Sequence, residues 1–167
     1  VLTISCVFSS YSIMFNGPVI GQSGAFDWTY TNTGSNHTIL IPNTISNNIG
    51  GVPLAVGDYL GVFYDNNGVE ECAGYTMWNG SSLAMSAWGS ETGMNNGLAS
   101  GDTFIWKVWR AADGVVIDAV ATYETVGFPN TDLYLTNGIS AITSFVAGME
   151  EDLSDLVVGT YSVIVTD

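Results

Sequence analysis

The 167-residue chain is poor in charge and strongly acidic, with 2 Lys and Arg against 16 Asp and Glu and a net charge of −14. Nucleic acids and anionic membrane surfaces are bound through basic side chains, so this balance argues against both as partners. The sequence holds no run of apolar residues long enough to span a bilayer, and we expect no membrane insertion.

The remaining composition is typical of a secreted β-protein. Hydrophobic residues make up 47% of the chain, and its polar residues are mostly Ser, Thr, Asn and Gly. We therefore expect an extracellular or cell-surface location. The length fits one domain over residues 1–167, and the absence of an initial Met suggests a mature or excised part of a longer secreted protein. The acidity has two open explanations, solubility through charge repulsion or binding of a divalent cation.

The first third of the chain predicts short strands separated by turns. Apolar and polar residues alternate over residues 2–8, and further strands are expected over 11–15, 25–31 and 37–41. Residues 43–57 are polar and contain Gly50, Gly51 and Pro53, which predicts a loop.

The clearest local signal is a hairpin. Residues 59–64 alternate, Asp65, Asn66, Asn67 and Gly68 form a turn sequence, and residues 69–78 return. Asn and Gly tolerate the positive φ angles that a two-residue hairpin turn requires. A short strand over 83–88 and a long Gly- and Asn-rich loop over 89–101 are expected to follow.

Residues 103–110 alternate almost without interruption. Phe104, Trp106 and Val108 are expected on one face, and Ile105, Lys107 and Trp109 on the other, so at least one of the two tryptophans should lie outside the main core. Strands are also predicted over residues 115–123, 133–135, 139–146 and 159–167, with a possible helical turn over 149–157. Many short strands and almost no helix predict an all-β fold, an antiparallel β-sandwich of immunoglobulin-like or jelly-roll-like type. Residues 147–167 are either a return segment or the start of a second module.

The two cysteines, Cys6 and Cys72, are expected to form one disulfide in an oxidising compartment, which would stabilise the fold by roughly 2–4 kcal/mol. Two separate buried thiols are the alternative. The chain has a single histidine, His37, so two thiols and one imidazole make a poor zinc site.

The sequence indicates that the protein is not an enzyme. His37 lacks the partners of a catalytic triad, and no Gly-x-Ser-x-Gly elbow occurs. Glu70 and Glu71 follow the hairpin turn, where carboxylates more often form a solvated face than a glycosidase pair. No catalytic residue is assigned.

Calcium is the one cofactor that the sequence raises. Asp65 and Asn67 place oxygen ligands at short spacing in the hairpin turn, although the later bidentate carboxylate of an EF-hand is missing. A second candidate is the acidic run Glu150, Glu151, Asp152 and Asp155, which could equally be a solvated charge cluster.

Trp28, Trp78 and Trp88 lie near predicted strand ends, where exposed rings could stack on sugars. Packing in the core or at a subunit interface is the alternative for each of them.

Parts of the chain resemble a β-module of large secreted and cell-surface proteins of Bacteroidota-type bacteria. The similarity covers roughly residues 25–125 and is carried by segments 53–63, 72–75, 87–88, 97–101 and 104–109. Residues 159–167 resemble the closing strand of tandem repeats in gliding-type surface adhesins. The resemblance implies export, modular repetition and a role in adhesion, filament building or matrix attachment, and it brings no catalytic residues.

These observations lead to two hypotheses. The first is a non-enzymatic extracellular structural or adhesive module, a subunit of an adhesin or filament, that contacts further copies or neighbouring modules. Its contacts would be terminal strand exchange through residues 2–8 and 161–165, which include Ile4 and Val163, and a surface formed by Lys107, Trp109 and Arg110. The second is a carbohydrate-binding module that binds glycans through the surface tryptophans.

Overall fold

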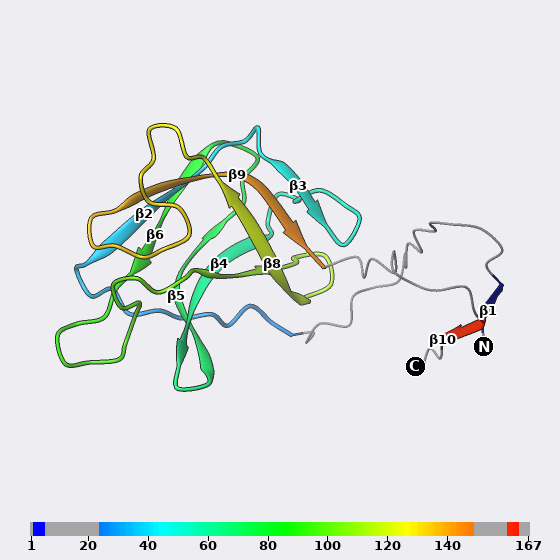
Figure 1. The fold of residues 1–167 in the computed structure, drawn as a ribbon, viewed down its shortest axis with the longest axis horizontal. Helices are drawn as coiled ribbons and strands as arrows, with labels where there is room; N and C mark the ends of the chain where they lie inside the picture. Colours follow the sequence, from blue (N-terminus) through cyan, green and yellow to red (C-terminus); the bar gives the residue numbers. More distant parts are fainter. Residues whose placement is uncertain (1, 6–23, 149–159, 164–167) are drawn as a thin grey trace. The chain divides into compact units, whose positions relative to one another are not determined.

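The part of the chain that the structure describes is β-structure without helix, which confirms the all-β prediction. This computed structural model describes residues 2–5, 24–148 and 160–163 (Figure 1). Its strands are β1 (Leu2–Ser5), β2 (Asn36–Ile41), β3 (Ser46–Ile49), β4 (Tyr59–Asn66), β5 (Val69–Met77), β6 (Leu83–Trp88), β7 (Ile105–Trp109), β8 (Val116–Tyr123), β9 (Ile139–Ala147) and β10 (Thr160–Val163).

The chain divides into two compact units. Both chain ends belong to the first unit, in which β1 pairs antiparallel with β10, and strands β2 to β9 belong to the second. The single domain predicted over residues 1–167 stays a prediction, because a division into compact units does not show whether they fold separately. Residues 147–167, predicted as a return segment or a second module, contribute β10, which returns to pair with β1. The strand-exchange hypothesis had expected such terminal strands to pair with a neighbouring copy.

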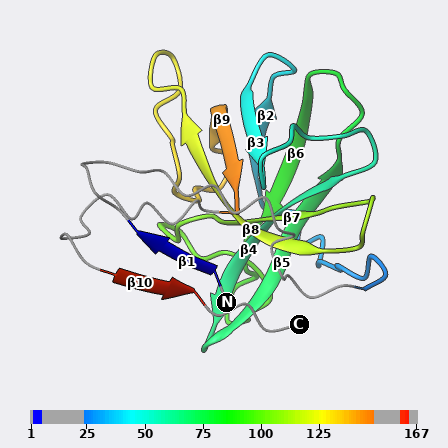
Figure 2. The same cartoon turned by 90° about the vertical axis from the view of Figure 1, so that its right-hand side faces the viewer.

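The larger unit is one eight-stranded sheet. Its strand order is β5-β4-β7-β8-β9-β2-β6, and β3 pairs with β9 beside this path. Most pairings are antiparallel, but β9 runs parallel to both β2 and β3, so the prediction of a purely antiparallel sheet is wrong. Figure 2 shows β9, β2 and β6 side by side. A parallel pair needs a long connection between its strands, and local sequence patterns do not reveal such pairs.

The two ends of the strand path, β5 and β6, lie against each other and nearly close the sheet into a barrel-like form. Gly74 of β5 makes this contact possible. A Cβ atom at this position would lie 2.0 Å from the backbone oxygen of Ser86 in β6. Glycine is therefore needed where the two backbones approach most closely.

The β4–β5 hairpin forms as predicted. Asn67 and Gly68 adopt φ angles of 55° and 88°, and the Gly68 amide donates to Asp65 Oδ1 at 2.5 Å. The strands continue from this turn to Tyr59 and Met77, with a register shift between Val62 and Phe63.

Three local predictions differ from the structure. Residues 25–31, predicted as a strand, are extended but join no sheet, because their aromatic rings pack on the outside of the sheet instead of their backbone pairing with it. Residues 46–49, predicted as loop, form β3 because β9 offers them a parallel partner. Residues 133–135 make only an isolated bridge through Leu133. The segments predicted over residues 11–15 and 149–157 lie outside the described residues.

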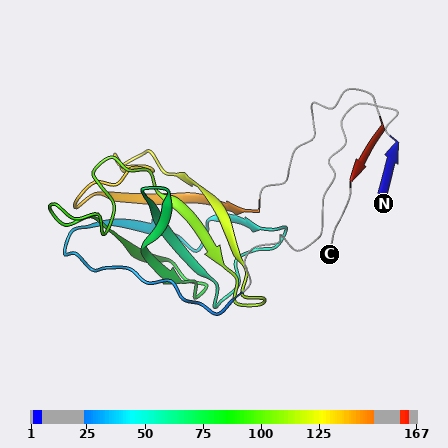
Figure 3. The same ribbon diagram turned by 90° about the horizontal axis from the view of Figure 1, so that it is seen from below.

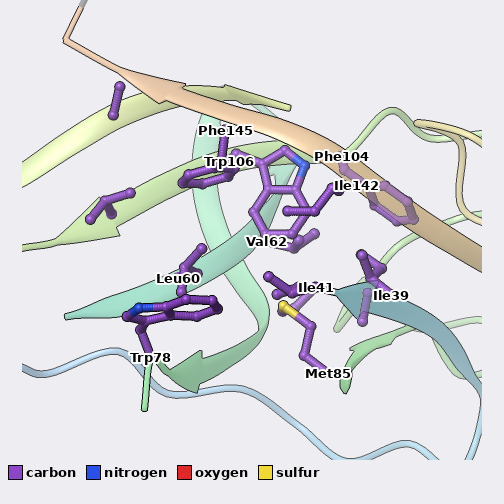
Figure 4. Close-up of a cluster of buried hydrophobic side chains, with 14 of the residues drawn as sticks. Ile39, Ile41, Leu60, Val62, Trp78, Met85, Phe104, Trp106, Ile142 and Phe145 are labelled. Atoms are coloured by element: carbon purple, nitrogen blue, oxygen red, sulfur yellow. The ribbon is translucent and has the colours of Figure 1, made fainter. Parts of the chain in front are cut away.

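The core lies inside the nearly closed sheet and is drawn in Figure 4. Alternate residues of facing strands supply it, with Ile39 from β2, Leu60 from β4, Trp106 from β7 and Phe145 from β9. Each large side chain contributes roughly 1.5–3 kcal/mol by leaving water. Trp106 also donates from Nε1 to the hydroxyl of Tyr123 at 2.7 Å. The predicted alternation of β7 is confirmed, because Trp106 is buried whereas Trp109 lies half-buried on the opposite face.

A buried imidazole joins β2 to β9. His37 is fully buried, and its Nδ1 accepts the Leu135 amide at 3.2 Å. The ring proton therefore resides on Nε2, which lies 2.8 Å from Ser140 Oγ. Ser140 in turn lies within hydrogen-bond distance of the carbonyls of Asn130 and Thr131. This neutral tautomer has a structural role.

We expect Gly74→Ala to destabilise the larger unit by about 1–3 kcal/mol, because the added methyl group would separate β5 from β6. Urea denaturation followed by intrinsic fluorescence measures the change. Gly24→Ala is the matched control, because a Cβ atom at Gly24 would meet nothing within 4 Å. Equal midpoints for the two variants would contradict the assigned role of Gly74.

Stability should fall as the pH drops through the range in which His37 titrates. Burial lowers the pKa of His37, so the folded state takes up this proton at a lower pH than the unfolded state, whose pKa is about 6.5. The His37 contribution is thus complete above that value and declines below it, by at most about 1.4 kcal/mol per pH unit. Urea midpoints between pH 5 and pH 8 measure this slope. His37→Gln should flatten the slope, and an unchanged slope would assign it to other groups.

Candidate ligand-binding groove

The outer face of β4, β5 and β7 carries aromatic rings instead of a polar surface. Phe26 lies at their centre, with its ring centroid 3.9 Å from that of Tyr59, 4.9 Å from Tyr75 and 5.5 Å from Trp109. Trp109 also donates from Nε1 to the Gly24 carbonyl at 3.2 Å. These contacts hold the extended segment before β2 along the outside of the sheet, where Figure 3 shows it.

Trp28 lies directly on the backbone of β4. A Cβ atom at Gly61 would lie 2.6 Å from Trp28 Cζ3, so the indole needs glycine beneath it. The Trp28 ring also meets Phe63 edge to face, with centroids 5.0 Å apart. The central residues of β4 are consequently buried on both faces of the sheet, by the core on one side and by this segment on the other.

A groove of about 650 Å³ lies beside these rings. The aromatic residues Trp28, Tyr30 and Phe63 form part of its wall, and Tyr30 is 41% exposed. The remaining lining residues are mostly polar and come from the segment before β2, from β4 and β5, and from the loop after β6: Thr29, Thr31, Tyr64, Asn66, Glu71, Cys72, Asn95 and Asn96.

A tyrosine–carboxylate pair lies in the groove. The Tyr64 hydroxyl donates to Glu71 Oε2 at 2.6 Å and lies 3.4 Å from the Asn95 carbonyl. The hydrogen bond from Tyr64, followed by one from Asn66, lowers the pKa of Glu71. Burial, and then the carboxylate of Glu71, raise the pKa of Tyr64. At neutral pH the pair is therefore a neutral phenol and an ionised carboxylate.

Asparagine side chains tie the hairpin to the loop over residues 89–101. Asn66 Nδ2 donates to the Asn95 carbonyl at 3.3 Å, and Asn95 Nδ2 donates back to Asn66 Oδ1. Asn96 Nδ2 donates to Glu91 Oε2 at 2.8 Å and thereby braces the loop itself. The polar side of the groove is thus held in place by hydrogen bonds.

The groups that line the groove are mostly uncharged at neutral pH. Burial raises the pKa of Cys72 to about 11, so its thiol is neutral and weakly nucleophilic at neutral pH. Glu71 is the one carboxylate among the lining residues, whereas glycoside hydrolysis ordinarily requires a pair. Half-exposed aromatic rings beside amides, hydroxyls and one carboxylate are the groups with which proteins bind polyhydroxylated ligands.

The structure does not bring the three predicted sugar-binding tryptophans together. Trp28 lines the groove. Trp78 is 5% exposed and packs in the core, so its predicted role as a surface platform is wrong. Trp88 lies half-buried at the end of β6 and is not among the groove's lining residues. Position near a strand end therefore did not decide exposure, because the sheet closes around Trp78.

Lys107 of the predicted subunit interface is paired within the chain. Its ammonium lies 2.7 Å from Glu70 and 2.5 Å from Asp118, over the ring of Phe63. Hydrogen bonds to these carboxylates raise the pKa of Lys107 against the opposing effect of desolvation by burial, which is the largest single influence. The side chain is 16% exposed, and a contact of Lys107 with an acidic patch on a neighbouring copy would compete with these internal pairs and stays a prediction.

Arg110 also contacts partners within the chain. Its Nε lies 3.4 Å from Asp58 Oδ2, and its Nη1 donates to the Ile49 carbonyl at 3.1 Å. Asp58 is fully buried and also accepts the amides of Ala55 and Ala111 at 2.9 and 3.0 Å. The pair fastens the loop before β4 to the turn after β7, and the subunit-interface role of Arg110 stays a prediction.

Among the other predicted residues, two lie on the terminal strands and Cys72 lines the groove. Ile4 and Val163 belong to the terminal pair, where Ile4 is opposite Tyr161 and Val163 is opposite Leu2. Cys72 forms no disulfide with a described residue, and its predicted partner Cys6 lies outside the described ranges.

The calcium prediction concerns the hairpin turn, where Asp65 caps the Gly68 amide and Asn67 Nδ2 donates to the side chain of Asn66. Within residues 2–5, 24–148 and 160–163, no group of three or more His, Cys, Asp or Glu side chains could hold a metal ion. The second acidic candidate, from Glu150 to Asp155, lies outside these residues. The described parts of the chain also contain no helix that could span a membrane.

No protein-family model matches the chain, and no curated protein matches it. Among solved structures, it is similar to a 9R-lipoxygenase from Cyanothece PCC8801, with a TM-score of 0.36 and 11% identity. That similarity covers 74% of this chain and 18% of the lipoxygenase chain.

Sequence reasoning missed most of the groove, including Tyr30, Phe63, Asn66, Glu71, Asn95 and Asn96. One signal was present: β4 carries Tyr59 and Phe63 on the face opposite Leu60 and Val62. A strand with large apolar residues on both faces must be covered on both. The identity of the covering segment and the meeting of Asn66 with Asn95 depend on long-range contacts.

Gly61→Ala should move Trp28 away from β4, because the new methyl group would overlap the indole. We expect a loss of about 1–3 kcal/mol in unfolding free energy and stronger acrylamide quenching of Trp28. The Trp28 signal is the difference between the fluorescence of each protein and that of its Trp28→Phe counterpart. Gly24→Ala serves as the control, and an unchanged Trp28 signal in Gly61→Ala would refute this packing.

Proposed function

We propose that this chain is a non-enzymatic extracellular module that binds carbohydrate in the groove and thereby serves adhesion. The observation that carries the proposal is the joint placement of half-exposed rings and hydrogen-bonding side chains around one cavity, which is lined by Trp28 and Tyr30 together with Asn66, Glu71 and Asn95.

The groove matches the two parts of a sugar's chemistry. The C–H face of a pyranose ring packs on aromatic surfaces, where Trp28 and Tyr30 offer apolar area at little entropic cost. Its hydroxyl groups need donors and acceptors at the ring's edge. Glu71 and the asparagine amides supply these, and the hydroxyls of Thr29 and Thr31 make no hydrogen bond with another described residue. A volume of about 650 Å³ is in the range of small-ligand sites.

The wider proposal rests on composition. Scarce charge and abundant Ser, Thr, Asn and Gly support an extracellular setting, and the resemblance to surface-protein modules supports a place beside other modules of the same protein. The finer fold that we propose is a β-sandwich in which β4 and β7 face β2 and β9. Support for this assignment comes from the core, where the inward residues of these strands form one cluster.

Trp28→Ala and Tyr30→Ala should each weaken glycan binding roughly tenfold, because losing a stacked ring costs about 1–2 kcal/mol. Glycan-array screening finds the ligand, and affinity electrophoresis through the matching polysaccharide measures the effect. Trp88→Ala is the matched control, since it removes a half-buried indole that does not line the groove. Absence of binding to every glycan, or equal losses in all three variants, would overturn the proposal.

A further inference from the structure

We infer that the groove takes an uncharged glycan and that Glu71 makes it reject acidic ones, such as polymers with uronate, sialate or sulfate groups. The inference rests on the proposed function and narrows its ligand class. It is drawn from the distribution of charge around the groove.

No cation is available to an acidic sugar. Carboxylates and sulfates are bound in proteins mainly by Arg and Lys, and neither residue lines the groove. Lys107 and Arg110 are the only lysine and arginine residues in the sequence. Lys107 is held between Glu70 and Asp118, and Arg110 is held by Asp58.

Glu71 places a fixed negative charge in the groove. The hydrogen bonds from Tyr64 and Asn66 favour its ionised form, so it keeps its charge at neutral pH. An ionised carboxylate only accepts hydrogen bonds. A sugar hydroxyl can donate to it, whereas a uronate brought to the same place would meet a like charge.

The other polar groups of the groove offer an anion only uncharged donors. The Tyr64 hydroxyl already donates to Glu71, and the amides of Asn66 and Asn95 already donate to each other's oxygens. Asn96 Nδ2 is engaged by Glu91. A neutral sugar brings its own hydroxyl donors to such a site, whereas an anion would find no charged donor there, only the hydroxyls of Thr29 and Thr31 and the second N–H of each amide.

The test compares each polysaccharide in a neutral form and in a form that carries uronate groups. Soluble β-glucan, galactomannan and xylan are each paired with an acidic derivative, the first two oxidised at C6 to the uronate and xylan carrying glucuronate branches. Affinity electrophoresis at low salt measures retardation of the wild-type protein, Glu71→Gln and Glu124→Gln. Glu124 lines a different cavity, so its variant removes the same charge away from the groove.

We expect at least one neutral polymer to bind, with its acidic partner bound at least tenfold more weakly. Glu71→Gln should bind the acidic partner severalfold better than Glu124→Gln does. Added salt should also narrow the wild-type difference, since it screens the repulsion.

The contradicting results distinguish a failure of the proposed carbohydrate-binding function from a failure of the inference about charge. If no neutral or acidic glycan binds, the proposed function itself fails. Equal or stronger binding of the acidic partner would overturn the charge inference and leave the proposed function standing. Discrimination that is identical in Glu71→Gln and Glu124→Gln would overturn the role of Glu71.

Discussion

The contact between β5 and β6 is the constraint on which the groove depends. Without a side chain at Gly74, these strands meet and the sheet nearly closes. Closure brings the loop that follows β6 to the tip of the β4–β5 hairpin, where Asn95 and Asn66 exchange hydrogen bonds. The polar side of the groove is thus a result of how the sheet ends meet, and these residues are far apart in sequence.

The aromatic side of the groove has a separate origin in the extended segment before β2. This segment forms no ladder and is held by ring contacts, with Phe26 against Tyr59 and Trp28 over Gly61. Side-chain packing thereby holds this segment on the sheet, whereas backbone hydrogen bonds hold the strands of the sheet together. The absence of a side chain at Gly61 leaves the backbone of β4 open to an indole, in the same way as Gly74 leaves β5 open to β6.

Sequence patterns predicted what depends on near neighbours. The turn at Asn67 and Gly68 follows from their tolerance of positive φ, and the division of Trp106 from Trp109 follows from alternation. Partners distant in sequence were not predictable. The burial of Trp78, the parallel partners of β9 and the carboxylates around Lys107 all depend on which strands become neighbours. Of the groove, only Trp28 was predicted.

The internal pairing of Lys107 and Arg110 also determines how this protein can meet others. Both positive side chains form ion pairs within the fold. Lys107 pairs with Glu70 and Asp118 on the neighbouring part of the sheet, and Arg110 pairs with the buried carboxylate of Asp58. In a chain with 16 acidic residues, each of these two cations thus already has a carboxylate partner within the described residues. An attraction between identical copies through these two side chains would have to compete with the internal ion pairs. A protein that docks here by charge must bring the lysines and arginines itself.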